Sequence, residues 1–278
     1  MLLSLDQYLN RVTEGDCLEV MKNFPDHSID LVLCDLPYGT TLNPWDIPID
    51  FSLLWQQYER IIKPNGVIAL TAAGIFTGKV ILSNPAWFKY KIVWIKSKST
   101  NFLNAKKQPL RRHEDICIFY NKQPAYQPQM IPGKPYNRGW RKTSTTGCYG
   151  HYKASPILSS SGDRYPYDIL FFDEQEPDDW FYCKTCEHED TRPFHPTQKP
   201  VELGRYLIRT FSVPGAIVLD NACGCGSFLI AAIREDRRFI GIEKNSGAYH
   251  LKVKAVDFVK IARERIAAEP PPDFLFPT

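Results

Sequence analysis

The sequence predicts an α/β protein with a Rossmann-like, mostly parallel sheet, helices on both faces, and an inserted irregular region. Short apolar runs bounded by Pro, Gly, Asn or charged residues alternate with segments whose apolar residues have helical spacing. The alternation stops between about residues 121 and 194, where prolines, a Ser-Ser-Ser-Gly turn and an acidic stretch occur instead. Strands that alternate with helices form parallel sheets, and the interrupted part predicts a functional insertion.

Six apolar runs have the length and the boundaries of buried strands, and they cover residues 29–34, 66–70, 91–95, 116–120, 216–219 and 238–242. Helical spacing is clearest from residue 51 to residue 62, where Leu54, Trp55, Tyr58, Ile61 and Ile62 recur on one face. Residues 228–234 and 248–268 have similar spacing and predict two further helices.

The composition is that of a globular protein. The chain has 278 residues, 44% hydrophobic and 23% charged, which excludes a disordered chain, collagen and a small disulfide scaffold.

The longest apolar stretches are about half the roughly 20 residues that a membrane helix needs, so we expect no membrane span. The first ten residues lack a basic start and an apolar run, so we expect no secretory signal. The eight scattered cysteines predict thiols in a reducing compartment, hence a cytoplasmic protein.

Charge is distributed unevenly along the chain. Residues 60–162 hold 17 Lys or Arg and only two acids, Glu114 and Asp115, although the whole chain carries a net charge of only +3. A short run of this kind is ordinarily a solvated face, but a hundred residues of one sign repel each other unless a polyanion neutralises them. Between residues 126 and 153 tyrosines and a tryptophan alternate with the basic residues. Cations for phosphates and rings for bases predict a nucleic-acid partner.

A first motif lies at residues 218–228, where an apolar strand leads to Asp220 and then to Gly224-Cys225-Gly226 before a helix. Such glycines let the backbone approach a ligand at a helix N-terminus, although a tight turn would explain them equally well. A second strand ends at Glu243, 23 residues after Asp220, where an acid can accept both ribose hydroxyls of a nucleoside cofactor. A dinucleotide loop would require a third glycine where Phe228 stands, which favours S-adenosylmethionine.

A second motif, Asp35-Leu36-Pro37-Tyr38, follows the strand at residues 29–34. It could be only a Pro-Tyr turn capped by Asp35. However, ligands of open parallel sheets bind at the carboxyl ends of strands. A carboxylate and a main-chain carbonyl there could hold the two N–H groups of an exocyclic amine while an aromatic ring stacks on the base.

These motifs resemble those of DNA amino-methyltransferases. Asp35-Leu36-Pro37-Tyr38 resembles the Asp-Pro-Pro-Tyr signature of that family, and four further segments are similar to its motifs in order, at residues 60–66, 112–119, 195–200 and 220–228. The catalytic motif precedes the variable region and the cofactor loop, which is the order of the permuted β class that methylates adenine N6 or cytosine N4. An Asp at position 35 resembles the adenine-N6 group. The resemblance covers about residues 10–260.

The resemblance implies the site residues. The catalytic residues would be Asp35, Leu36, Pro37 and Tyr38. The residues that bind S-adenosylmethionine would be Asp16, Cys17, Thr197, Lys199, Asp220, Ala222, Gly224, Gly226 and Glu243. Hydrogen bonds to Asp35 and the Leu36 carbonyl would draw the amine nitrogen of a flipped-out base toward sp³ character, ready for in-line attack on the methyl group. The sequence departs from the family pattern at Leu36, where proline is usual, and in the cofactor loop at Ala222 and Cys225.

Three regions follow from this interpretation: a catalytic half at 1–120, a target-recognition insertion at 121–190 and a cofactor-binding half at 191–278. Arginine can read guanine edges and asparagine adenine, whereas lysine contacts phosphates. The residues expected to bind double-stranded DNA are Arg111, Arg112, Lys134, Asn137, Arg138, Arg141, Lys142 and Lys153.

Several alternatives stay open at this point. The nearest is a cytosine-N4 DNA methyltransferase; a protein or RNA amino-methyltransferase is disfavoured by the motif order and the basic insertion. A binding module without catalysis would fit the charge but not the intact Asp35, Tyr38 and Glu243. Cys183 and Cys186, with His188 and His195, have zinc-ligand chemistry, but a single Cys-x-x-Cys pair leads us to expect no metal. The DNA site, a homodimer and a separate restriction endonuclease are left undetermined.

Overall fold

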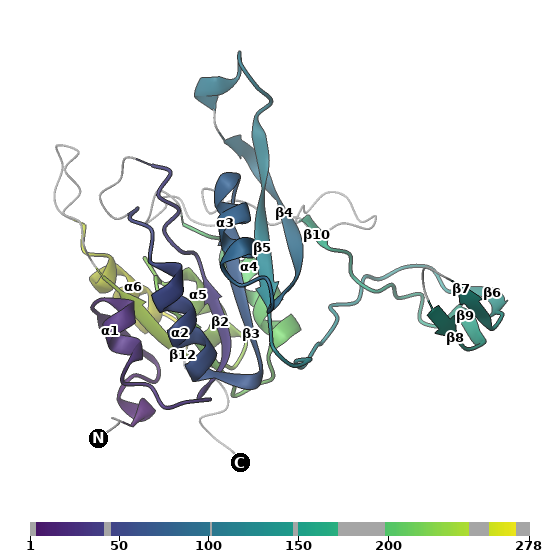
Figure 1. Ribbon diagram of the computed structural model, residues 1–278, viewed down its shortest axis with the longest axis horizontal. Coiled ribbons are helices and arrows are strands. Elements are labelled where there is room, and N and C mark those ends of the chain that lie inside the picture. Colours follow the sequence, from purple (N-terminus) through teal and green to yellow (C-terminus); the bar gives the residue numbers. More distant parts are fainter. Residues whose placement is uncertain are drawn as a thin grey trace. The chain divides into compact units, whose positions relative to one another are not determined.

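The computed structural model (Figure 1) describes residues 4–41, 46–100, 102–146, 150–171, 198–244 and 256–270. The chain forms two compact units, the larger comprising Met1–Gln127 with Asp168–Thr278 and the smaller comprising Pro128–Tyr167. The smaller unit falls inside the insertion expected at 121–190, and the flanking residues 121–127 and 168–171 fold with the larger unit. Cys183, Cys186, His188, His195 and Thr197 lie outside the described residues.

The larger unit contains an eight-stranded sheet. All neighbouring strands are parallel except β5, which runs antiparallel to both β3 and β4. The strand order is β1 (Arg11–Glu14), β12 (Arg238–Glu243), β11 (Ile217–Asp220), β2 (Ile29–Cys34), β3 (Ile62–Ala72), β5 (Arg111–Phe119), β4 (Phe88–Thr100) and β10 (Ile169–Phe171). The predicted α/β class and the mostly parallel sheet are confirmed, and every predicted strand is present.

Strands from the two ends of the chain pair with one another in this sheet, once inside it and once at its edge. β11 pairs with β2, with Val218 opposite Leu31, and β12 pairs with β1, with Glu243 opposite Glu14. The first and last thirds of the sequence therefore form one continuous sheet. As a consequence, the carboxyl ends of β2, β11 and β12 meet at one edge, which is where parallel sheets bind ligands.

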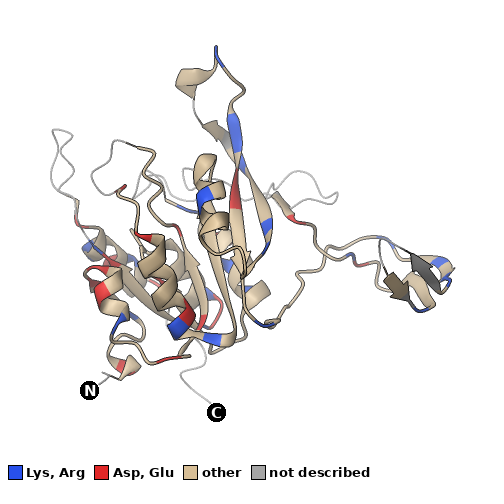
Figure 2. Ribbon diagram, in the orientation of Figure 1, with Lys and Arg blue, Asp and Glu red and all other residues tan. Residues whose placement is uncertain are grey.

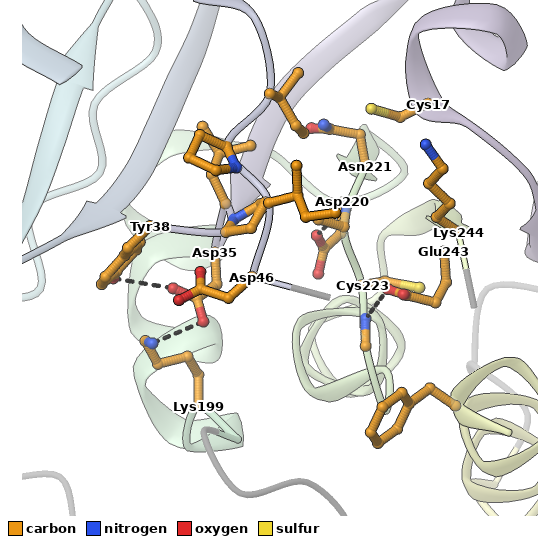
Figure 3. A pocket seen from close by; sticks show the side chains of 18 of the residues that line it. Cys17, Asp35, Tyr38, Asp46, Lys199, Asp220, Asn221, Cys223, Glu243 and Lys244 are labelled. Atoms are coloured by element: carbon orange, nitrogen blue, oxygen red, sulfur yellow. Dashed lines mark hydrogen bonds and ion pairs between the residues drawn. The ribbon is translucent and has the colours of Figure 1, made fainter. Parts of the chain in front are cut away.

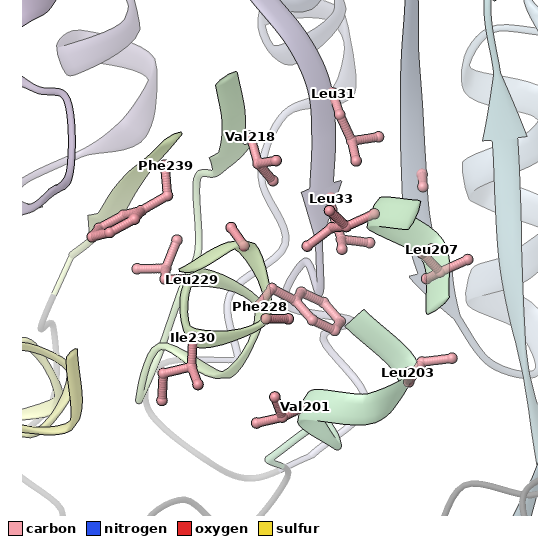
Figure 4. Close-up of a cluster of buried hydrophobic side chains, with 14 of the residues drawn as sticks. Leu31, Leu33, Val201, Leu203, Leu207, Val218, Phe228, Leu229, Ile230 and Phe239 are labelled. Atoms are coloured by element: carbon pink, nitrogen blue, oxygen red, sulfur yellow. The ribbon is translucent and has the colours of Figure 1, made fainter. Parts of the chain in front are cut away.

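Helices cover both faces of the sheet, and the period of two along each strand decides which side chain faces which layer. Val32 and Cys34 of β2 pack with α1 (Cys17–Met21), α2 (Phe51–Ile61) and α3 (Ile75–Ser83). Leu31 and Leu33 face the opposite layer, which contains α4 (Val201–Phe211), α5 (Ser227–Arg234) and α6 (Phe258–Ala267). Figure 4 shows Leu31, Leu33 and Val218 of the sheet packed against Leu207 and Phe228 of α4 and α5.

The predicted helix at 51–62 is present as α2, with Asp50 accepting a hydrogen bond from the Leu53 amide at its first turn. The helix expected at 228–234 corresponds to α5. The one expected at 248–268 is described only as α6, because residues 245–255 lie outside the described part. The sequence prediction named neither α1, α3 nor α4. Two short 3₁₀ turns complete the larger unit, η1 (Leu5–Gln7) and η2 (Phe102–Asn104).

The smaller unit corrects one expectation. Residues 136–159 were expected to be irregular, but they form two antiparallel pairs: β6 (Tyr136–Arg141) with β9 (Ser155–Ser159), and β7 (Ser144–Thr146) with β8 (Gly150–Tyr152). Five of the six residues of β6 are exposed, so neither face requires apolar side chains. The alternation that reveals half-buried strands is therefore missing from the sequence.

Among the helices of the described residues, none is both long and apolar enough to cross a membrane.

Candidate active site

A cavity of about 460 Å³ opens at the carboxyl ends of β2, β11 and β12. It brings together most of the residues expected to be catalytic or to bind the cofactor, although they are spread over more than 200 positions of the chain. Those lining it are Asp16, Cys17, Asp35, Leu36, Pro37, Tyr38, Lys199, Asp220, Ala222, Gly224 and Glu243. Figure 3 shows Tyr38, Asp35 and Lys199 together at one side of this cavity and Glu243 with Lys244 at the other.

Asp35 directly follows β2 and is held on both carboxylate oxygens. The Tyr38 hydroxyl donates to Oδ1 at 3.0 Å, and the Thr71 hydroxyl donates to the same oxygen. Lys199 Nζ donates to Oδ2 at 2.7 Å. Because donors from β3 and from the segment before α4 converge on it, this carboxylate has a fixed orientation at the cavity wall.

Lys199 links Asp35 to a second buried acid. Its Nζ lies 3.3 Å from Glu114 Oε2, and Lys96 Nζ lies 2.9 Å from Glu114 Oε1, with all three side chains largely buried. Burial alone would lower the pKa of Lys199, but the charges of Asp35 and Glu114 raise it well above its ordinary value. Burial would raise the pKa of Glu114, and the two lysines lower it. The result is an alternating row of four side chains, Asp35, Lys199, Glu114 and Lys96, in which the pKa shifts of Lys199 and Glu114 both favour the charged form.

The Tyr38 ring stacks on the ring of Phe76 of α3, with ring centroids 4.6 Å apart and planes 23° from parallel. Burial, followed by the Asp35 charge, raises the pKa of the Tyr38 hydroxyl well above its ordinary value, so the hydroxyl stays protonated and donates. Leu36 is 3% exposed and packs into the core beneath the cavity. The segment from Asp35 to Tyr38 is thus held in place by the buried Leu36 and by the hydrogen bond between Asp35 and Tyr38.

Asp46 shapes the loop that continues the cavity wall beyond Tyr38. Its carboxylate accepts hydrogen bonds from the amides of Gly39, Thr40 and Thr41 at 2.7–2.9 Å. Burial would raise the pKa of Asp46, but these donors and the Thr41 hydroxyl lower it. Gly39 has φ +65°, a backbone conformation that favours glycine, at the point where the chain turns to bring these three amides onto Asp46.

The glycine loop after β11 forms the opposite wall. Glu243 Oε2, at the end of β12, accepts a hydrogen bond from the Gly224 amide at 2.7 Å. Gly226 was expected to contact the cofactor, but it does not line the cavity. Its φ of +83° makes the turn that precedes α5, and a Cβ there would lie 3.2 Å from Ala262. In the structure, Gly226 therefore allows the backbone turn between β11 and α5.

Asp220 is buried at the end of β11. Burial raises its pKa to about 8, against the effect of hydrogen bonds from the Cys34 thiol and the Ala222 amide. Next to it, Asn221 Oδ1 accepts a hydrogen bond from the Tyr58 hydroxyl at 2.5 Å, which fixes the loop to α2. Asp16 caps α1 through the Leu18 amide, and its second oxygen accepts from Lys244 at 2.9 Å. Three acids, Asp16, Asp220 and Glu243, therefore gather at this end.

The expected DNA-binding residues do not lie in the cavity. Arg111 and Arg112 are exposed on β5 in the larger unit, and the Arg112 guanidinium donates to the Lys96 carbonyl at 3.0 Å. The other six, Lys134, Asn137, Arg138, Arg141, Lys142 and Lys153, are exposed in the smaller unit. Asn137 Oδ1 accepts a hydrogen bond from the Gly139 amide at 2.8 Å, so one end of this amide holds a turn.

Comparison with known proteins decides the family. A family model described as a DNA methylase of the N6/N4 type matches residues 29–254, which is most of the chain. The chain belongs to this DNA methylase family. The Type II methyltransferase M.BglII of Bacillus subtilis is 26% identical over 297 residues, covering 98% of this chain and 72% of that protein.

Solved structures of DNA methyltransferases share the fold of this methylase. The complex of M1.HpyAVI with S-adenosylmethionine has a TM-score of 0.55 at 19% identity and covers 92% of this chain and 98% of that chain. The PvuII DNA methyltransferase, which is cytosine-N4-specific, has a TM-score of 0.56 at 17% identity and covers 93% of each chain. These findings confirm the expected DNA methyltransferase and its Rossmann-like fold.

The donor set of the methylase's cavity fits S-adenosylmethionine, the cofactor of this class of reaction. That molecule carries a sulfonium and an ammonium, and the acids Asp16, Asp220 and Glu243 line one end of the cavity. The volume of about 460 Å³ lies within the range of pockets for ligands of this size.

The sequence analysis did not identify four residues of the methylase site: Thr71, Phe76, Lys96 and Glu114. Glu114 lies in a segment that resembles a family motif, but its contact with Lys199 was not foreseen. Lys199 itself was expected to bind the cofactor, and the structure places its ammonium on Asp35 and Glu114. Sequence signals for these contacts are absent because the partners lie far apart in the chain; Lys199 and Asp35 are 164 positions apart.

Proposed function

We propose that this methylase transfers the methyl group of S-adenosylmethionine to the N6 amine of an adenine that has left a DNA duplex. The observation that carries the proposal is the position of the Asp35 carboxylate. It is ion-paired with Lys199 at 2.7 Å and lines the same cavity as the glycine loop and Glu243. A fixed anion beside a cofactor-sized space suits an amine that must be held and oriented.

The protein's part in the reaction is chiefly orientation. Asp35 and the Leu36 carbonyl accept the two N–H groups of the amine, which turns the nitrogen lone pair out of conjugation with the ring. Lys199 and Thr71 prevent the carboxylate from rotating away, so the acceptor geometry exists before the base arrives. Orientation of this kind contributes several kcal/mol to catalysis, on the order of 7–11 at the limit. Asp35 is also placed to take the proton that the methylated amine loses.

Tyr38 provides the stacking surface for the base. Its ring is backed by Phe76, so it presents a supported aromatic face, and its hydroxyl is tied to Asp35 and Thr71. Stacking of a base on an aromatic side chain contributes about 1–3 kcal/mol. The same ring that receives the base therefore also helps to fix the carboxylate.

The other end of the cavity holds the methyl donor. S-adenosylmethionine supplies an electrophilic methyl group on a sulfonium. Glu243 would accept the ribose hydroxyls, the loop at Ala222 and Gly224 would approach the cofactor with its main chain, and Asp16, Cys17 and Asp220 would line the rest. Apolar residues of the wall, among them Pro37, Ile49 and Phe258, would limit the water around the methyl group once both ligands are bound.

The target is assigned to adenine because an Asp stands at position 35, as in the adenine group that the sequence resembles. The relevant measurement uses unmethylated λ DNA incubated with the protein and labelled S-adenosylmethionine, followed by digestion and mass spectrometry of the nucleosides. We expect N6-methyladenine. N4-methylcytosine would assign the methylase to the cytosine group, and no methylated nucleoside would overturn the proposal.

We further propose that residues 121–190 select the DNA site. Exposed Arg138 and Arg141 are candidates for base contacts, while Lys142 and Lys153 would contact phosphates. Neutralising one phosphate contact should reduce the salt slope of binding by about one without changing which sites are methylated. Replacing the whole segment by that of a related methylase should transfer site preference. Continued methylation of the original site would place specificity elsewhere.

A further inference from the structure

The hairpin formed by β4 and β5 projects beyond the sheet at the edge that carries the active site. β3 pairs with β5 only from Asp115 to Phe119, whereas β4 continues to pair with β5 as far as Thr100 and Arg111. Glu114, one residue past the β3 pairing, lines the cavity, so the projecting part begins at the site itself. Figure 1 shows these two strands extending beyond their neighbours.

The tip of this hairpin is apolar, exposed and folded. Phe102 and Leu103 in η2 are 75% and 83% exposed, and Leu110 is 41% exposed. The tip is folded by main-chain hydrogen bonds, from the Ala105 amide to the Phe102 carbonyl at 3.1 Å and from the amides of Lys107 and Gln108 to the Asn104 carbonyl at 2.8 and 3.0 Å. Single exposed apolar residues are ordinary, but two adjacent ones at the end of a projection form a feature that water solvates poorly.

The charge around the tip indicates what covers it. Residues 96–113 contain six Lys or Arg and no Asp or Glu. Among them Lys106, Lys107, Arg111 and Arg112 are exposed. Figure 2 shows blue segments along the hairpin, where Lys and Arg occur. An apolar tip with cations on its flanks is complementary to a duplex, whose phosphates lie outside and whose bases stack inside.

We propose that the β4–β5 tip is a wedge: Phe102 and Leu103 enter the DNA duplex and fill the gap left by the base that moves into the cavity. This inference rests on the proposed function, because it requires a target base that leaves the helix. The strand rise of about 3.3 Å per residue puts the tip on the order of 10–20 Å from Glu114, which is comparable to the width of a DNA groove. Lys106 and Lys107 hold the phosphates on either side.

The decisive experiment compares paired and unpaired targets. The recognition site is first mapped by sequencing λ DNA that the protein has methylated. The wild-type protein and the variant F102A/L103A are then assayed on a duplex that carries this site, and on the same duplex with an abasic position opposite the target. We expect the variant to lose about tenfold or more in kcat/KM on the paired duplex, and less than about twofold where the target is already unpaired, since opening the pair is the step that the wedge assists.

Three control variants separate the wedge from other effects. Leu82, 76% exposed at the far end of α3, is changed to alanine and should leave both substrates unaffected. K106Q/K107Q should lower the salt slope of DNA binding by about two, whereas F102A/L103A should leave that slope unchanged. Phe102→Leu should retain most of the paired-duplex activity because it keeps an apolar side chain.

Three results would overturn the wedge. Equal losses on paired and unpaired targets would mean that the tip acts on binding or folding, and no loss on either would mean that the tip does not enter the DNA. Sedimentation of F102A/L103A as a monomer beside a dimeric wild type would assign the tip to contact with a second copy. All three results leave the proposed function intact, and that function is overturned instead by a wild-type protein that methylates no DNA.

Discussion

The two ends of the cavity differ in how their acids are compensated. At one end, Asp35 and Glu114 alternate with Lys199 and Lys96 within 2.7–3.3 Å, so the protein neutralises its own carboxylates. At the other end, the buried carboxyl of Asp220 receives hydrogen bonds from neutral donors, the Cys34 thiol and the Ala222 amide, and burial raises its pKa to about 8.

This difference matches the ligands proposed for the two ends. An adenine amine is uncharged and brings no cation to orient the carboxylate that holds it, so Lys199 fixes Asp35 beforehand. S-adenosylmethionine brings positive charge of its own, which would favour the ionised form of the Asp220 carboxyl. Changes at the Asp35 end should therefore affect turnover, whereas changes at the Glu243 end should affect cofactor affinity.

The largest effect is expected from Asp35→Asn. It removes the anionic acceptor of the amine and should lower kcat by about 10²–10⁴-fold, in the range of a lost acid or base. The dissociation constant of S-adenosylmethionine, measured by calorimetry, should change less than about threefold. Turnover close to wild type would remove Asp35 from the reaction. Thermal unfolding of the variant serves as the folding control.

Glu243→Gln should have the converse effect. Loss of a charge-assisted acceptor typically costs about 1.5–3 kcal/mol, so cofactor affinity should fall by about 10–150-fold while kcat at saturating cofactor changes little. Glu14→Gln is the matched control, because Glu14 pairs with Glu243 in the sheet but does not line the cavity. An unchanged dissociation constant for Glu243→Gln would place the ribose elsewhere.

Lys199→Met tests whether this lysine belongs to the Asp35 end or to the cofactor. Lys199 is one of the two charges that lower the pKa of Glu114. Without its ammonium that pKa should rise, so the acid limb of the kcat/KM profile should move to higher pH, with about tenfold lower activity at neutral pH. Lys199→Arg should restore part of the activity and part of the original pH profile. Lys63→Met is the control, because it removes a similar ion pair, 2.7 Å to Asp30, at the opposite end of β2.

A rise in the dissociation constant of S-adenosylmethionine with an unshifted pH profile would contradict this assignment of Lys199. It would support instead the cofactor role that the sequence resemblance implied.

The smallest effect is expected from Asp220→Asn and concerns stability. In the folded state the carboxyl has a pKa of about 8, above its ordinary value of 3.8, so unfolding between these pH values releases a proton. The wild type is therefore favoured at low pH and loses that stability as the pH rises toward and through 8. Asp220→Asn should lack this dependence and gain at least about 1 kcal/mol relative to the wild type between pH 5 and pH 8.5. Parallel urea titrations that show equal pH dependence would exclude a raised pKa.

The helices, strands and motifs predicted correctly are those that depend on neighbouring residues in the sequence. The strand at 29–34, the motif from Asp35 to Tyr38 and the loop from Asp220 to Gly226 could be predicted because each depends on neighbouring residues: a buried apolar run, a strand end and a glycine turn. The strand β6 at 136–141 could not be predicted, because an exposed strand needs no apolar alternation.

The sequence by itself determined the fold class, the order of the motifs and the residue types of the site, since these are encoded in local patterns. Only the tertiary structure decided that β5 runs antiparallel, that Lys199 faces Asp35, and that Thr71, Phe76 and Glu114 complete the site. The physical reason is that hydrogen bonds, ion pairs and ring contacts depend on distance in space. Strand pairing across more than 180 positions of the chain, as between Leu31 and Val218, sets those distances.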